Sequence, residues 1–171
     1  SCYTAQIAKI ADKYADIILV GDSMGMVIYG QKNTLSVTKQ MMIEHGKAVV
    51  NSTKKALVVI DLPFGTYENS KKKAFKVSSE ILSKTGASAV KLEGGIELAD
   101  TINYLVERGI PVMGHIGLMP QRINIKGKFI TQGHSSLEVK KVITDAKSIA
   151  SAGVFSMVVE AVKESLGKKV T

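Results

Sequence analysis

Three acidic residues each follow a short apolar run, and their positions are the strongest chemical signal in the chain. Asp22, Asp61 and Glu93 follow the runs Ile17–Val20, Leu57–Ile60 and Ala89–Leu92. Each run is too short and too rich in β-branched residues for a helix, which predicts a buried parallel strand. A carboxylate at the C-terminal end of such a strand points to the edge of an α/β sheet or barrel where ligands bind. The three could therefore converge on one divalent cation.

Three further polar residues lie in or near strands of the same kind. Lys91 stands two residues before Glu93, so both side chains should point to the same side of one strand. His115 lies within the segment Gly114–Gly117. Glu160 follows the apolar residues 157–159, and we expect burial there to raise the pKa of its carboxyl, as suits a general base.

Taken together, these residues favour a shared site over separate structural roles. The structural alternatives are a turn cap for Asp22, a core position for Asp61 or His115, an ion pair of Lys91 with Glu93, and a salt bridge for Glu160. All six side chains come from five consecutive predicted strands. Carboxylates without a Cys or His cluster suit a hard cation, most plausibly Mg²⁺. Lys91 and His115 would then hold an anionic, carbonyl-bearing substrate, and Glu160 would remove a proton beside the carbonyl of a metal-chelated 2-oxo acid.

The order of the predicted elements favours a (β/α)₈ barrel over a doubly wound sheet. Strands are predicted at 17–20, 57–60, 89–92, 112–116 and 155–159, and helices at 4–14, 37–52, 69–84, 96–107, 136–151 and 163–168. Such alternation implies a parallel sheet with right-handed crossovers. A sixth strand is expected to be cut short at Cys2-Tyr3. A whole barrel is typically ~250 residues, so residues 1–171 predict one partial barrel domain, clipped at its N-terminus and lacking about two βα units at its C-terminus. The long connection Gly117–Ser135 is either a lid or binding loop over an active site or an ordinary surface loop.

Composition and charge argue against several other classes of protein. The 171 residues carry a formal charge of +8, but the lysines are spread along the chain without interleaved aromatics, which disfavours nucleic-acid recognition and suits attraction of an anionic substrate. No apolar run approaches the ~20 residues of a membrane span. The single cysteine, Cys2, allows no internal disulfide and fits a reducing compartment. Gly21–Gly25 matches neither a dinucleotide fingerprint nor a P-loop.

Five motifs that run in order along the chain resemble the 3-methyl-2-oxobutanoate hydroxymethyltransferase (ketopantoate hydroxymethyltransferase) family. The motifs are Ile18–Met26, Val59–Gly65, Ala89–Gly95, Pro111–Leu118 with Pro120-Gln121, and Val158–Val162. The resemblance implies a barrel of the phosphoenolpyruvate/pyruvate type. It also implies an enzyme of pantothenate and coenzyme A biosynthesis that transfers a hydroxymethyl group from 5,10-methylenetetrahydrofolate to 3-methyl-2-oxobutanoate, giving 2-dehydropantoate.

The same resemblance implies a role for each site residue. By resemblance, Mg²⁺ is bound by Asp22, Asp61 and Glu93. The 2-oxo acid contacts Asp22, Ser23, Asp61 and Lys91, with His115 nearby, and Glu160 is the proton acceptor. Members of the family from bacteria are typically cytoplasmic and often decameric, so a homo-oligomer is expected, with the 2-oxo acid and folate as its small-molecule partners.

Three alternative functions remain open. The family continues past a helix with a Gly-rich strand, whereas this sequence stops at Thr171. A non-catalytic fragment or binding module is therefore one alternative. Another Mg²⁺-dependent lyase or aldolase of the same barrel type, acting on a different 2-oxo acid, is the second. A basic nucleic-acid binder, suggested only by the net charge, is the third.

Overall fold

The computed structural model describes residues 1–125 and 127–171 in full and residue 126 by its backbone. The chain forms two compact units, Ser1–Lys91 and Leu92–Thr171. None of the helices in this described part of the chain is both long enough and apolar enough to cross a membrane.

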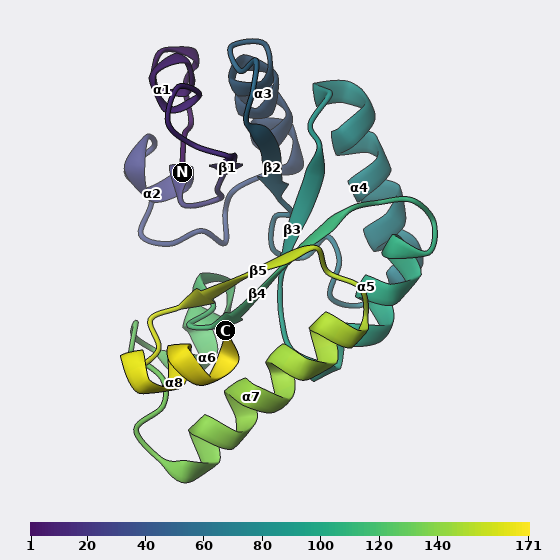
Figure 1. The fold of residues 1–171 in the computed structure, drawn as a ribbon. Helices are drawn as coiled ribbons and strands as arrows, with labels where there is room; N and C mark the ends of the chain where they lie inside the picture. Colours follow the sequence, from purple (N-terminus) through teal and green to yellow (C-terminus); the bar gives the residue numbers. More distant parts are fainter. The chain divides into compact units, whose positions relative to one another are not determined.

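The first unit is a parallel sheet with helices between its strands (Figure 1). Along the chain it contains α1 (Ala5–Ala11), β1 (Ile17–Val20), α2 (Met24–Val27), α3 (Lys39–Val50), β2 (Leu57–Asp61), α4 (Lys71–Thr85) and the start of β3 (Ala89–Glu93). β1 pairs with β2, and β2 pairs with β3, all in parallel. The register places Asp61 opposite Lys91, so the polar ends of β2 and β3 lie side by side.

Local sequence signals explain where the helices of this unit begin and end. Thr4, Thr38 and Ser70 each accept a hydrogen bond from the backbone N–H three residues on, which caps α1, α3 and α4. α4 ends at Gly86, whose φ of 75° is a left-handed conformation that glycine adopts without a steric penalty.

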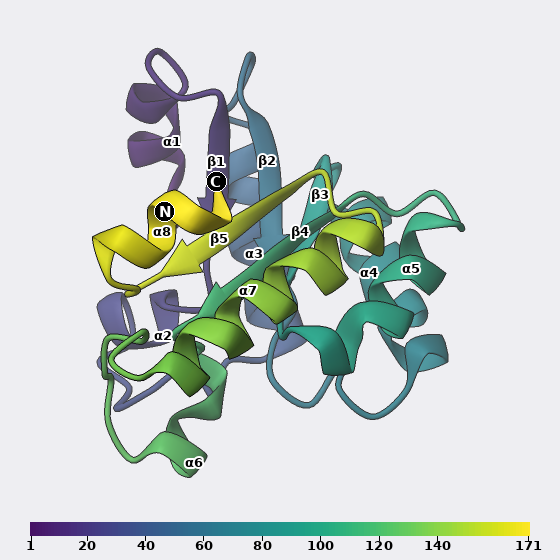
Figure 2. The same ribbon diagram turned by 60° about the horizontal axis from the view of Figure 1, so that its bottom comes forward.

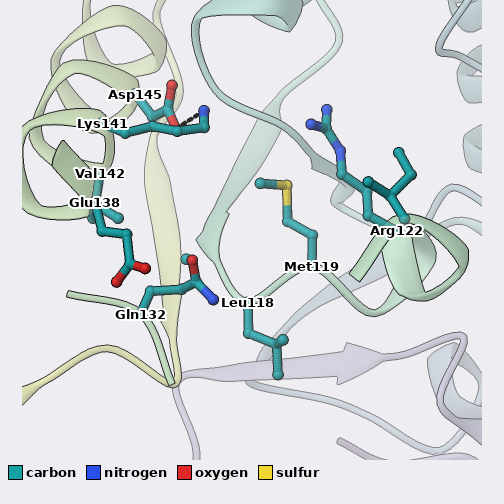
Figure 3. A pocket seen from close by; sticks show the side chains of 10 residues that line it. Leu118, Met119, Arg122, Gln132, Glu138, Lys141, Val142 and Asp145 are labelled. Atoms are coloured by element: carbon teal, nitrogen blue, oxygen red, sulfur yellow. Dashed lines mark hydrogen bonds and ion pairs between the residues drawn. The ribbon is translucent and has the colours of Figure 1, made fainter. Parts of the chain in front are cut away.

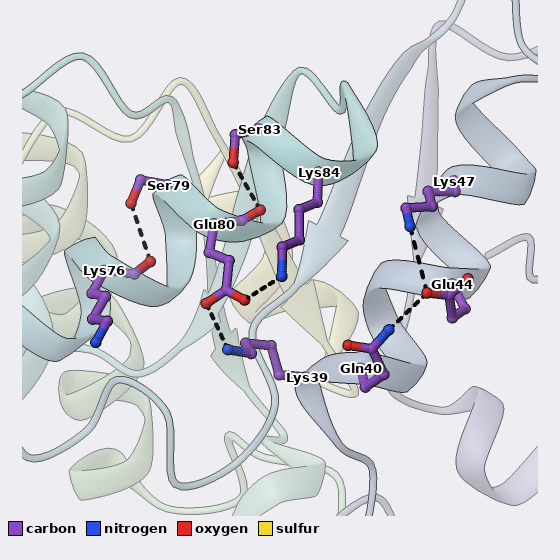
Figure 4. Close-up of polar contacts among 9 residues, drawn as sticks. All are labelled: Lys39, Gln40, Glu44, Lys47, Lys76, Ser79, Glu80, Ser83 and Lys84. Carbon is purple, nitrogen blue, oxygen red and sulfur yellow. Dashed lines mark hydrogen bonds and ion pairs between the residues drawn. The ribbon is translucent and has the colours of Figure 1, made fainter.

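An ion-pair cluster joins α3 to α4 at the surface of the first unit. Glu80 on α4 lies 2.6 Å from the Lys39 Nζ of α3 and 2.8 Å from the Lys84 Nζ of its own helix (Figure 4). Hydrogen bonds from these two ammonium groups lower the pKa of Glu80 to about 2.

The second unit repeats the strand–helix alternation. After the end of β3 come a 3₁₀ turn η1 (Ile96–Leu98), α5 (Ala99–Val106), β4 (Val112–Gly117), a 3₁₀ turn η2 (Pro120–Arg122), α6 (Ile123–Lys126), α7 (Ser136–Ser151), β5 (Ser156–Glu160) and α8 (Glu164–Val170). β4 and β5 are parallel neighbours, and α7 packs along β4 (Figure 2). Buried side chains of α5, β4 and α7, among them Ile102, Ile116 and Ile149, form its core.

A capping box fixes the start of α7. The Ser135 hydroxyl accepts from the Glu138 N–H at 3.2 Å, and Glu138 Oε2 accepts from the backbone N–H groups of Gly133 and His134. These backbone hydrogen bonds lower the pKa of the Glu138 carboxyl. The end of the 117–135 connection is therefore anchored to α7.

The five predicted strands are all present, each with its ends within one residue of the predicted ones. The helices differ more. The predicted helix 96–107 is divided into η1 and α5, and the 117–135 connection contains two short turns of helix rather than irregular chain. Residues 1–3 are not assigned to a strand, yet the Cys2 N–H donates to the Leu19 carbonyl at 2.8 Å, as expected for the end of a strand beside β1. The single-domain interpretation of residues 1–171 stays a prediction.

Candidate functional site

In the first unit, a buried polar network joins the C-terminal ends of β1, β2 and β3. Asp61 Oδ2 accepts a hydrogen bond from the Asp22 backbone N–H at 3.1 Å, and Asp61 Oδ1 lies 2.8 Å from Lys91 Nζ. The side chains of Lys91 and Asp61 are only 3% and 4% exposed. Parallel strands end at one edge of their sheet, and the structure accordingly brings the Asp61 carboxylate beside the Lys91 ammonium and the Asp22 backbone. The roles of these residues stay a prediction.

The turn after β1 brings Ser23 close to this network. A Cβ built on Gly21 would lie 2.9 Å from Ser23 Oγ and 3.5 Å from Asp61 Oδ2, so glycine there lets the backbone approach the carboxylate. The Ser23 hydroxyl is 2.8 Å from the Tyr3 hydroxyl. Ser23 is therefore already oriented by a hydrogen bond within the unit.

Sequence reasoning missed the two residues that support Ser23. The Tyr3 carbonyl accepts from His45 Nδ1 at 2.6 Å, and His45 Nε2 is 2.9 Å from the Tyr29 hydroxyl. His45 lies on α3, far along the sequence from Tyr3, and no local pattern links the two. Only the fold, which places α3 beside the residues before α1, reveals the connection.

In the second unit, His115 lies between two carboxylates. His115 Nδ1 is 3.8 Å from Glu93 Oε1, and His115 Nε2 is 3.4 Å from Glu160 Oε2. Glu93 Oε2 also accepts from the Gln121 N–H at 3.0 Å. Glu93 and His115 are buried, and the parallel register of β4 with β5 brings the ends of the two strands together.

The prediction that Glu160 is buried is wrong. Its side chain is 41% exposed, because it is the last residue of β5 and every residue of that strand is only partly covered. The apolar residues before Glu160 predict burial, but burial depends on neighbouring elements that this local pattern does not specify. A partly exposed carboxylate beside an imidazole is nevertheless accessible to a substrate.

Among the described residues, no three His, Cys, Asp or Glu side chains are placed closely enough to hold a metal ion. The magnesium ligands named from the sequence, Asp22, Asp61 and Glu93, fall in different units, with the two aspartates in the first and Glu93 in the second.

A cavity of about 260 Å³ lies between the 117–135 connection and α7 in the second unit. The Met119 side chain extends into the space that the labelled residues enclose (Figure 3). One wall carries the ion pair between Lys141 and Asp145 at 2.7 Å, and Asp145 also accepts from the Ile96 N–H at 3.2 Å. The connection that the sequence left open as a lid or a surface excursion therefore forms one wall of a cavity.

Comparison with solved structures defines the class of fold. The chain superposes on phosphonopyruvate hydrolase in complex with oxalate and Mg⁺⁺ with a TM-score of 0.68, at 15% identity, over 94% of this chain and 56% of that one. For 2,3-dimethylmalate lyase, a member of the PEP mutase/isocitrate lyase superfamily, the TM-score is 0.70 at 13% identity, over 99% and 58%. The predicted fold class, a partial (β/α)₈ barrel of the phosphoenolpyruvate/pyruvate type, is thus confirmed.

Sequence comparison then identifies the family. A family model described as ketopantoate hydroxymethyltransferase matches residues 1–171. The chain is 54% identical over 171 residues to 3-methyl-2-oxobutanoate hydroxymethyltransferase of Bartonella tribocorum, and 50% identical to that of Sinorhizobium fredii. The chain belongs to the ketopantoate hydroxymethyltransferase family, and it spans 63% of the length of these two relatives, all of its own residues being matched.

Proposed function

We propose that this chain contributes the catalytic site of a hydroxymethyltransferase that converts 3-methyl-2-oxobutanoate, 5,10-methylenetetrahydrofolate and one water into 2-dehydropantoate and tetrahydrofolate. The observation that carries the proposal is the buried network of Asp22, Asp61 and Lys91 at three strand ends, in a chain about half identical to enzymes of that name. Ordinary structural ion pairs are seldom so fully buried, because desolvation of both charges is costly.

We propose Mg²⁺ as the cofactor, bound by Asp22, Asp61 and Glu93. All three donors are buried carboxylates at the ends of successive strands, and carboxylate oxygens are the ligands that Mg²⁺ prefers. The proposal rests on this donor chemistry and on the family resemblance, because no group of three such side chains is formed among the described residues. A structure of the same fold, phosphonopyruvate hydrolase, contains Mg⁺⁺ with oxalate, a small dianion with adjacent carboxylates. When bound, Mg²⁺ would polarise the 2-oxo group and make the neighbouring C–H more acidic.

The residues of the first unit would bind the substrate. The Lys91 ammonium is buried, and its ion pair with Asp61 at 2.8 Å fixes its position. It would attract the carboxylate of the 2-oxo acid. Ser23, oriented by the Tyr3 hydroxyl, would donate to the same anion, and Asp22 and Asp61 would complete the contacts.

Glu160 would act as the general base. It would accept the proton from C3 of the 2-oxo acid on a carboxylate oxygen, and its exposed side chain leaves that oxygen within reach of a ligand. His115, 3.4 Å away through Nε2, would orient the carboxylate. The resulting enolate carbon would then bond to the one-carbon unit of the folate. The two C–N bonds that hold this unit would break, water would supply the hydroxyl oxygen, and tetrahydrofolate would leave.

The first step can be tested without folate. Proton NMR of 3-methyl-2-oxobutanoate in D₂O with the protein and Mg²⁺ should show loss of the C3–H signal. Glu160→Gln should slow this exchange by about 10²-fold to 10⁴-fold. Glu164→Gln is the matched control, because Glu164 is exposed on the next helix and forms a surface ion pair with Lys168. This variant should exchange the C3–H within about twofold of the wild-type rate. Equal rates for the two variants would refute the role of Glu160.

Turnover with 5,10-methylenetetrahydrofolate separates the hydroxymethyltransferase from the alternatives. A lyase or aldolase of the same fold would act on a 2-oxo acid without folate, and a non-catalytic fragment would show neither exchange nor turnover. The resemblance further suggests a cytoplasmic homo-oligomer, which sedimentation of the purified protein would test.

A further inference from the structure

The residue directly after the candidate base has an unusual backbone conformation. Ala161 has a φ of 46°, and it is the one non-glycine residue with positive φ in the described part of the chain. Nine other positive-φ positions are glycines, which adopt such conformations without a steric penalty. An alanine stays there only where surrounding contacts hold it, and such strain tends to occur at functional sites.

Hydrogen bonds hold the peptide groups on both sides of Ala161. The Leu118 N–H donates to the Glu160 carbonyl at 2.9 Å, and the Gln132 N–H donates to the Ala161 carbonyl at 2.7 Å. The Gln132 carbonyl in turn accepts from the Lys163 N–H at 3.1 Å. The backbone from Glu160 to Lys163 is thus fastened at two points to the connection that leads from β4 to α7.

Close packing adds to these bonds. A Cβ built on Gly117 would lie 2.3 Å from the Glu160 carbonyl oxygen, so the end of β4 lies directly against the peptide that leaves Glu160. The Ala161 side chain itself is exposed, so a larger side chain has room at this position. The conformation therefore depends on the backbone contacts and not on the size of residue 161.

These contacts matter because the Glu160 side chain is only partly covered. The contact with His115 acts on the carboxylate at the far end of the side chain, whereas the direction of the Cα–Cβ bond is set by the backbone. Catalytic groups need placement to within roughly 0.5 Å, and a shift of about 1 Å can cost a hundredfold in rate.

We infer that Ala161, held in its left-handed conformation by the Leu118 and Gln132 amides, is a positioning residue for the base Glu160. This inference rests on the proposed function, since it assumes that Glu160 removes the proton. It assigns to the 117–135 connection the task of setting the angle at which the base meets its substrate.

Two substitutions of the exposed residue Ala161 test the inference. Ala161→Asn should keep the conformation, because asparagine tolerates positive φ, whereas Ala161→Val should lose it, because a β-branched residue does not. In the D₂O exchange assay with Mg²⁺, Ala161→Asn should retain kcat within about threefold. Ala161→Val should lower kcat about tenfold or more while KM changes by less than about threefold, a split expected of misplacement and not of lost binding. Equal kcat values for the two variants would overturn the inference.

A second readout needs neither substrate nor metal. Amide hydrogen exchange followed by NMR should show the Leu118 and Gln132 N–H groups protected in wild type and in Ala161→Asn, and less protected in Ala161→Val, with the remaining amides unchanged as evidence that the variant is folded. Unchanged protection in Ala161→Val would overturn the inference by itself. Absence of C3–H exchange in wild type would instead count against the proposed function, and the amide data would still decide whether Ala161 fixes this backbone.

Discussion

Replacing Lys91 by methionine tests the buried pair at the centre of the first unit. Methionine keeps the length and most of the volume of the lysine stem, so little cavity is created. The substitution leaves the Asp61 carboxylate, 4% exposed, with the Asp22 N–H but without its cation 2.8 Å away. Breaking a buried pair by removing one partner costs about 3–5 kcal/mol, which is a loss of roughly 10²-fold to 10⁴-fold in the folding equilibrium constant.

The assay is urea unfolding at neutral pH, followed by far-ultraviolet circular dichroism. Lys91→Met should lower the free energy of unfolding by about 3–5 kcal/mol with an unchanged dependence on urea concentration. The double variant Lys91→Met with Asp61→Asn removes the unpaired charge of residue 61, while an amide oxygen there still accepts from the Asp22 N–H. The double variant should therefore recover at least about 2 kcal/mol of the free energy of unfolding that the single variant loses. Lys72→Met, at an exposed position on α4, is the control and should change stability by less than about 0.5 kcal/mol.

Two results would refute this reasoning. A cost below about 1 kcal/mol for Lys91→Met would mean that the Asp61 charge is solvated in a way that its burial does not show. A double variant no more stable than the single one would mean that the loss comes from packing of the lysine stem and not from the charge.

Two further substitutions test packing and charge away from the site. A Cβ on Gly95 would lie 2.1 Å from the Asp145 carboxyl carbon, so Gly95→Ala should displace that side chain and lower stability by about 1–3 kcal/mol in the same urea assay; Gly167→Ala, with its nearest contact at 3.7 Å, should not destabilise. Because its two lysine partners lower the pKa of Glu80 from 4.5 to about 2, this carboxylate stabilises the fold at pH values above 4.5, and its contribution is lost as the pH falls from 4.5 towards 2. The difference in melting temperature between wild type and Glu80→Gln should shrink over that range, and a constant difference would contradict the assignment.

The sequence predicted the positions of strand ends well, because the evidence for them is local. An apolar, β-branched run followed by a carboxylate predicts both a strand and the polar residue at its C-terminal end. The position of Asp61 opposite Lys91 then follows from the parallel register of β2 and β3. Helix starts were predicted less closely: the predicted helices 37–52 and 69–84 begin two residues before α3 and α4, whose N-caps are Thr38 and Ser70.

Other properties of the site depend on contacts between distant segments. The exposure of Glu160 is set by what covers β5, and the apolar residues before it carry no information on that. The conformation of Ala161 comes from amides far along the chain, since alanine has no intrinsic preference for positive φ. The support of Ser23 by Tyr3 and His45 likewise joins residues that no sequence spacing relates.

The hydrogen bond between His45 and the Tyr3 carbonyl determines which atoms donate in this network. A carbonyl oxygen can only accept, so the ring proton of His45 must reside on Nδ1, and in the neutral ring Nε2 is left as an acceptor. The Tyr29 hydroxyl, 2.9 Å away, must then be the donor. The hydrogen bonds therefore all point one way, from the exposed Tyr29 through the His45 imidazole to the backbone of Tyr3, whose hydroxyl contacts Ser23. The tautomer of His45 is thus linked to the residue that orients Ser23 in the candidate site.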